Sequence, residues 1–212
     1  MRQQLLVVLP HPDDESIVAG TLIKQIQAGA QVTYVCLTLG EMGRNMGIPL
    51  FASRATLPLI RKRELEEACR IIGIQDVRRW GMHDKTVEFE DREVWAERLK
   101  ELIIDLRPAV IYTFYPGHAV HPDHDACGAI VVRAVELMEP SERPEVHCAA
   151  ILPTSREVLG PPDIVNDVSE VVEQKVQAIS AHQTQYQLMI GNANPQKVER
   201  FKKERLWRYR FV

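Results

Sequence analysis

The chain has few of the features that mark secreted, membrane-spanning or nucleic-acid-binding proteins. Its four cysteines are dispersed over 212 residues without a CxxC pair, which predicts buried, reduced thiols and excludes a disulfide-rich scaffold. No apolar stretch approaches the ~18 residues of a membrane span, and the first residues lack the apolar core of a signal peptide. Lysine and arginine, 26 together, nearly balance 29 aspartates and glutamates, so a general affinity for nucleic acid is not expected. These absences favour a cytoplasmic protein without nucleic-acid or membrane partners.

Hydrophobic residues make up 45% of the chain, enough to form a sizeable core, and we expect residues 1–212 to fold as a single domain. Apolar runs predict strands at 5–9, 32–39, 77–82, 110–114 and 146–152. Helical periodicity predicts helices at 14–28, 57–72, 91–106, 125–138, 169–182 and 196–206. This alternation indicates an α/β fold, a Rossmann-like three-layer sandwich with a mostly parallel central sheet.

The segment 40–56 is too long for an ordinary strand-to-helix connection, and it holds three glycines and a proline among scattered polar residues. Long loops placed on a rigid scaffold commonly carry function. One acid, Glu41, stands against five cations between residues 40 and 63. These cations are Arg44, Arg54, Arg61, Lys62 and Arg63. Their excess points to an anionic ligand.

Two similar tetrapeptides, His11-Pro12-Asp13-Asp14 and His121-Pro122-Asp123-His124, stand far apart in the sequence. Each follows an apolar run that predicts a strand. In open α/β sheets the carboxyl ends of the strands form the ligand crevice, so the two motifs are expected to meet there. Together they bring three imidazoles and three carboxylates to that edge, which is the composition of a metal site.

Zinc in a hydrolytic site takes three protein ligands drawn from His, Asp and Glu, and it leaves one position for water. His11 and Asp14, three residues apart at a strand-to-helix turn, can reach one ion, and His124 can supply the third ligand across the crevice. These ligand types suit Fe²⁺ and Co²⁺ as well as Zn²⁺. A single such motif would indicate only a helix start, because proline and acids favour the first turn. The second copy favours a metal site.

The remaining motif residues are candidates for proton transfer. Asp13 lies beside the predicted ligands without being one of them, so it is the natural general base for the metal-bound water. His121 can stabilise a developing oxyanion or protonate a leaving amine. Asp123 is a plausible partner that holds the His121 imidazole in place.

These residues resemble the zinc-dependent N-acetylglucosaminyl deacetylases of the PIG-L/LmbE-like family. The resemblance spans most of the chain and is carried by the two motifs together with Gly40-Glu41 and Arg61-x-x-Glu64-Leu65. It implies the same three zinc ligands, the same base and the same role for His121, and it implies that Arg61 and Asp84 contact the sugar. We add Glu41 and Arg54 as candidate substrate-binding residues. Relatives also imply a homo-oligomer, a trimer or a hexamer.

Within that family, two segments are similar to the second paralogous type of the branch that acts on N-acetylglucosaminyl malate in bacillithiol biosynthesis. They begin at Trp80 and at Phe114. Charge supports this substrate, because malate adds two carboxylates that the arginine-rich segment could bind, whereas a neutral inositol would not need it. The family tyrosine that often precedes the second motif is absent here. His118 is either its replacement or an exposed loop residue.

The sequence therefore predicts a hydrolase that removes the N-acetyl group of an N-acetylglucosamine conjugate by zinc-activated water, with Asp13 as general base. A conjugate of inositol or a chitooligosaccharide is an alternative substrate to the malate conjugate. A metal-dependent sugar-binding module without turnover is an alternative from another class, although a binder has no need of a base. Phosphoester hydrolysis is less attractive, because such enzymes often use two metals. His83, His147 and His182 receive no role, although 182–185 is similar to a C-terminal segment of the family.

Overall fold

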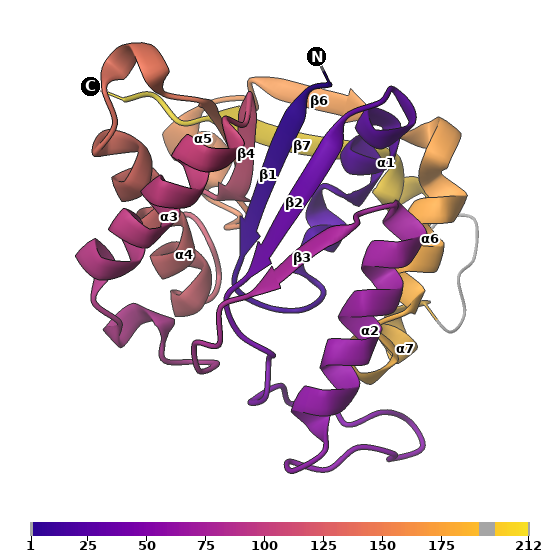
Figure 1. Ribbon diagram of the computed structural model, residues 1–212. Coiled ribbons are helices and arrows are strands. Elements are labelled where there is room, and N and C mark those ends of the chain that lie inside the picture. Colours follow the sequence, from indigo (N-terminus) through magenta and orange to yellow (C-terminus); the bar gives the residue numbers. More distant parts are fainter. Residues whose placement is uncertain (1, 191–197, 212) are drawn as a thin grey trace.

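The computed structural model describes residues 2–190 and 198–211, and they form one seven-stranded sheet with helices on both faces (Figure 1). The strand order is β3-β2-β1-β4-β5-β7-β6. The strands are β1 (Gln4–Leu9), β2 (Gln31–Cys36), β3 (Asp76–Arg79), β4 (Val110–Phe114), β5 (Glu145–Ala149), β6 (Ile164–Asp167) and β7 (Lys203–Arg208). Strands β1 to β5 pair in parallel, and β7 runs antiparallel to both β5 and β6.

The helices cover the sheet in two layers. They are α1 (Ala19–Gln27), α2 (Leu57–Ile72), α3 (Arg92–Leu106), α4 (Pro122–Glu136), α5 (Ser155–Leu159), α6 (Val172–Ser180) and α7 (Gln183–Ile190). In Figure 1, α3 and α4 lie on one face, and α1, α2 and α6 lie on the other. Alternate residues of β1 enter two separate cores, Leu5 and Val7 on one face, Leu6 and Val8 on the other. The expected three-layer α/β sandwich is confirmed.

The predicted elements of the first 150 residues agree with the structure to within a few positions at each end. The helix expected at 57–72 has those bounds, and Gly73 ends it with a φ of 99°, a conformation that glycine adopts without strain. Asp91 begins α3 by accepting the main-chain N–H groups of Glu93 and Val94. The four cysteines are free and buried, as expected.

The prediction of a helix at 196–206 is wrong. Residues 196 and 197 lie outside the described residues, and the rest of the range leads through the 3-10 turn η5 (Arg200–Lys202) into β7. Glu204 misled the prediction, because it counts as polar but its side chain is only 3% exposed in the structure. Its carboxylate accepts the main-chain N–H groups of Gly20 and Thr21 and pairs with the Lys175 ammonium. These bonds attach β7 to α1 and α6 and satisfy the buried charge.

The carboxyl ends of β1 to β4 lie at one edge of the sheet, the lower edge in Figure 1, and the loops that follow these strands gather there. The loop after β2 has no helix or strand before α2, as the segment 40–56 predicts. Within the described residues no helix is both long enough and apolar enough to cross a membrane.

Candidate metal centre and active site

Three donor groups from the two motifs face one another at this edge. His11 Nδ1 lies 3.2 Å from an Asp14 oxygen and 3.2 Å from His124 Nε2. His124 Nε2 lies 3.3 Å from the other Asp14 oxygen. Ligands held 2.0–2.1 Å from a tetrahedral zinc are separated by about 3.3 Å, so the spacing and the donor types both fit the ion. The main-chain N–H of His11 also donates to Asp14 at 2.9 Å and fixes its carboxylate.

The second nitrogen of His11 faces two carboxylates. Its Nε2 lies 3.1 Å from Asp123 Oδ2 and 3.2 Å from Asp84 Oδ1. A histidine that binds metal usually donates its other ring N–H to a carboxylate, which orients the ring and leaves the first nitrogen free to ligate. The expectation that the Asp123 carboxylate holds His121 is therefore wrong, because this carboxylate contacts His11 instead.

A second group of possible ligands shares one histidine with the first: His11, Asp84, His121 and Asp123. Its carboxylates are already occupied by hydrogen bonds from the main chain. Asp123 accepts the N–H of Lys85 at 2.7 Å and of Val87 at 3.2 Å. Asp84 accepts the N–H of Met42 at 2.8 Å. Burial raises the Asp84 pKa, but the hydrogen bond and charge of His11, together with the Met42 N–H and the Arg61 charge, outweigh burial and hold that pKa at about 2. The group of His11, Asp14 and His124 therefore stays the predicted metal site.

His121 stands at the start of α4 beside the metal ligands. The main-chain N–H of Asp123 donates to its Nδ1 at 3.2 Å, so the proton of the neutral ring belongs on Nε2. The ring packs edge-on against His11 with the centroids 5.0 Å apart. In this tautomer His121 can donate a hydrogen bond from Nε2.

Asp13 adopts a left-handed backbone conformation, with a φ of 100°, that few non-glycine residues tolerate. Its N–H donates to Glu15 at 3.0 Å, and its carboxylate lies 3.2 Å from the buried Arg61 guanidinium. Arg61 also donates to the carbonyls of Gly40 and Pro12. Burial raises the pKa of Asp13 to about 7 against the lowering effect of Arg61. A carboxyl group of that pKa suits a general base near neutral pH.

Gly40 is required where Arg61 crosses the loop. A Cβ at this position would lie 1.9 Å from a guanidinium nitrogen, and the glycine φ of 62° also disfavours a side chain. The loop after β2 can therefore pack closely against Arg61 because residue 40 has no side chain.

The three ligands, Asp13 and His121 line a pocket of about 430 Å³. Arg61 and Asp84 line it too, as expected of residues that contact a substrate. Glu41 and Arg54 lie outside the lining. Arg54 donates to the carbonyls of Glu41 and Gly43, both at 2.9 Å, and the Glu41 carboxylate accepts the N–H of Asp84 at 3.0 Å. These two residues shape the loop, and their assignment as substrate contacts stays a prediction.

Three histidines whose role the sequence leaves open, His83, His118 and His147, are not among the residues that line the pocket. His118 packs edge-on against Tyr115 in the turn after β4. His83 is exposed and bonds through Nδ1 to the Asp84 carbonyl. His147 bonds to Glu145 on β5.

Several pocket residues were not identified from the sequence. Lys85 comes from the turn after β3, and Gln185 and Tyr186 come from α7. The sequence pattern does not predict α7 as a separate helix. The one available signal was the similarity of 182–185 to a family segment, and it gave no role.

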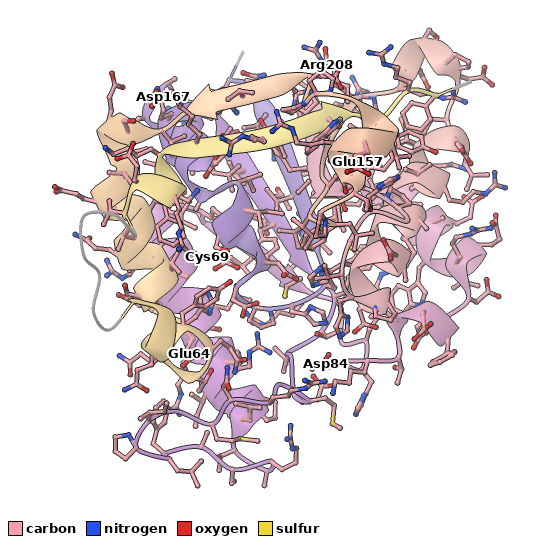
Figure 2. The ribbon with its side chains drawn as sticks, turned by 180° about the vertical axis from the view of Figure 1, so that it is seen from behind. Glu64, Cys69, Asp84, Glu157, Asp167 and Arg208 are labelled. Carbon is pink, nitrogen blue, oxygen red and sulfur yellow. The ribbon has the colours of Figure 1, made fainter. Side chains whose placement is uncertain are left out.

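Two buried carboxylates attach the end of α6 and the start of α7 to the site. Glu64 of α2, which lies next to α7 in Figure 2, accepts the N–H and the hydroxyl of Thr184 at 2.7 and 2.6 Å. One Glu15 oxygen accepts a hydrogen bond from His182 Nε2, and the other accepts the main-chain N–H of Asp13. The C-terminal segment is therefore coupled to the first motif.

The His182–Glu15 pair is fully buried, with exposures of 0% and 1%. Burial alone lowers the pKa of His182, but the charge and the hydrogen bond of Glu15 raise it above its usual value. Asp13 raises this pKa further and Arg61 opposes the rise. A charged imidazole here is stabilised only while Glu15 remains its partner.

We expect His182→Gln to lower the free energy of unfolding by about 3–5 kcal/mol, because it leaves a buried carboxylate without its cation. The stabilisation from the raised pKa is complete below about pH 6.5 and disappears as pH rises through the folded value, so the deficit should shrink at alkaline pH. Urea unfolding at several pH values measures both. His147→Gln is the matched control, since its Glu145 partner is exposed and the change should cost at most ~1 kcal/mol. Equal losses in the two variants would contradict the prediction.

Comparison with known proteins agrees with this geometry. The family model described as PIG-L, GlcNAc-PI de-N-acetylase, matches residues 6–135. The chain is 48% identical to a Bacillus subtilis (strain 168) protein named probable N-acetyl-alpha-D-glucosaminyl L-malate deacetylase 2, covering 100% of this chain and 99% of the relative. A Bacillus cereus protein of the same name is 46% identical, with 100% of both chains covered. Among solved structures, the N,N'-diacetylchitobiose deacetylase of Pyrococcus horikoshii superposes with a TM-score of 0.76 at 22% identity, covering 98% of this chain and 84% of that chain.

Together with these relatives, the α/β sandwich and the His/Asp cluster at its strand ends indicate a metal-dependent hydrolase of the deacetylase class. The chain belongs to the PIG-L family, and the resemblance drawn from the two motifs is confirmed. The superposition at 22% identity shows the shared fold.

Proposed function

We propose that this protein is a zinc-dependent N-deacetylase, one domain over residues 1–212, that releases acetate from N-acetylglucosaminyl malate. The observation that carries the proposal is a carboxylate, Asp13, held beside the His11, Asp14 and His124 cluster without belonging to it. The Bacillus relatives that match the full chain support the malate conjugate. A trimer or hexamer remains the expectation for the assembly.

His11, Asp14 and His124 would hold the ion, with Fe²⁺ and Co²⁺ as alternatives that the same ligands accept. When bound there, zinc lowers the pKa of a water molecule toward neutrality and polarises the acetyl carbonyl. Asp123 and Asp84 support the ion indirectly, because they orient the His11 ring.

The proton transfers belong to Asp13 and His121. Asp13 accepts a proton from the attacking water, and Arg61 keeps its carboxylate directed into the pocket. His121 carries its proton on Nε2, so it donates to the acetyl oxygen as charge develops there and can protonate the departing amine. Arg61 and Asp84 contact the sugar from the pocket wall.

Purified, zinc-loaded protein is expected to release acetate and free amine from N-acetylglucosaminyl malate with a higher kcat/KM than from the inositol conjugate or from N,N'-diacetylchitobiose. The measurement is a free-amine assay over the three substrates at equal concentration. A protein that binds these conjugates in calorimetry without acetate release would instead be a sugar-binding module. Preference for a neutral conjugate would contradict the malate assignment and leave the deacetylase assignment intact.

A further inference from the structure

Three cations line the pocket: Arg44, Arg61 and Lys85. Arg61 already has an anionic partner in the protein, because its guanidinium is buried against Asp13 and two carbonyls. The other two differ from it. Both are exposed, and no carboxylate of residues 2–190 or 198–211 lies within ion-pair distance of either side chain.

Each acidic side chain that lines the pocket already has a partner other than Arg44 or Lys85. Asp13 pairs with Arg61, and Asp14 lies between His11 and His124. Asp84 faces His11 and accepts a main-chain N–H. An anion that complements Arg44 and Lys85 would therefore belong to a ligand.

Lys85 is held at the pocket by a strained turn. Its φ is 68°, a left-handed conformation that a lysine adopts at a cost of about 1 kcal/mol and that glycine would adopt freely. The buried Asp123 carboxylate fixes this turn by accepting the Lys85 N–H at 2.7 Å. A strained residue at a functional site suggests that the side chain is needed there.

Arg44 lies in the loop between β2 and α2, and hydrogen bonds hold the main chain of both neighbouring residues. The Gly43 carbonyl accepts a hydrogen bond from Arg54 at 2.9 Å. The Asn45 carbonyl accepts one from Gln185 of α7 at 3.3 Å. The main chain that carries Arg44 is thus braced on both sides, which lowers the entropy lost when its side chain binds a ligand.

We propose that Arg44 and Lys85 form the subsite for the aglycone and select a conjugate that carries carboxylates. Arg44 supplies a planar fork for one carboxylate and Lys85 a point charge for a second, which fits a small dicarboxylic acid attached to the sugar. This inference rests on the proposed deacetylase function. It also limits the role expected of segment 40–63, because only Arg44 and Arg61 of its five cations line the pocket.

The test compares N-acetylglucosaminyl malate with the neutral methyl glycoside of N-acetylglucosamine in the zinc-loaded enzyme. Arg44→Gln and Lys85→Gln should each lower kcat/KM for the malate conjugate about 10- to 100-fold, mainly through KM, as expected for a lost charge-assisted bond. The loss on the malate conjugate should exceed the loss on the methyl glycoside at least tenfold. Arg63→Gln, a cation of the same segment outside the pocket lining, is the matched control and should change neither.

Lys85→Gly separates charge from backbone strain. Glycine relaxes the turn, so this variant should unfold at the same or higher denaturant concentration than the wild type and still lose the preference for the malate conjugate. Lys85→Arg should retain most of the preference. Equal losses on both substrates, or a preference that survives Lys85→Gly, would overturn the subsite. A wild-type enzyme that cleaves neither substrate would instead overturn the deacetylase function.

Discussion

Asp13→Asn is expected to lower kcat by about 10²- to 10⁴-fold while zinc stays bound, because the variant loses a general base and no ligand. Asparagine has the shape of aspartate and tolerates the left-handed conformation that Asp13 adopts, with its φ of 100°. The main-chain bond from residue 13 to Glu15 is also kept. The change therefore removes the proton acceptor and leaves its surroundings in place.

Acetate release and bound zinc, the latter by elemental analysis, must be measured on the same preparation. Asp167→Asn is a suitable control, because Asp167 lies at the end of the molecule opposite Asp84 in Figure 2 and its bond to the Ser169 N–H can persist through the amide oxygen. Loss of zinc together with activity would show that Asp13 holds the ion. Wild-type kcat in Asp13→Asn would exclude it as the base.

The parts of the fold that follow from local patterns were predictable. A continuous apolar run gave β1, and apolar periodicity closed by Gly73 gave α2. The same holds for the proximity of the two motifs, since segments at the ends of parallel strands must lie at one edge of the sheet. In each case the information is contained within a short stretch of sequence or in the topology of the sheet.

The parts that depend on distant contacts were not predictable. Glu204 is buried because Lys175 and the main chain of α1 surround it, and no sequence period shows this. Thr184 is fixed by Glu64, 120 residues earlier, so α7 could not be recognised as part of the site. Asp123 stands two residues after His121 in the motif, but its carboxylate lies against His11, and the turn after β3 supplies two N–H donors there.

The choice between the two groups of possible ligands gives the second large expected effect. Asp14→Asn should abolish high-affinity zinc binding, because it removes one of three ligands. Asp123→Asn should weaken zinc binding only about 10- to 100-fold, since it disturbs the orientation of the His11 ring and leaves the ligands intact. Competition with a chelator of known affinity measures both constants without reference to activity.

Unfolding gives an independent measure of the same difference. Zinc at 100 times its dissociation constant stabilises a folded protein by about 2.7 kcal/mol, so adding zinc to chelated wild-type protein should raise the unfolding free energy by that amount. Asp14→Asn should lose this increment, whereas Asp123→Asn should recover it at higher zinc concentration. If Asp14→Asn binds zinc like the wild type and Asp123→Asn does not, the ion belongs to the group of His11, Asp84, His121 and Asp123. His121 would then be a ligand and could not donate the proton that the proposed mechanism requires.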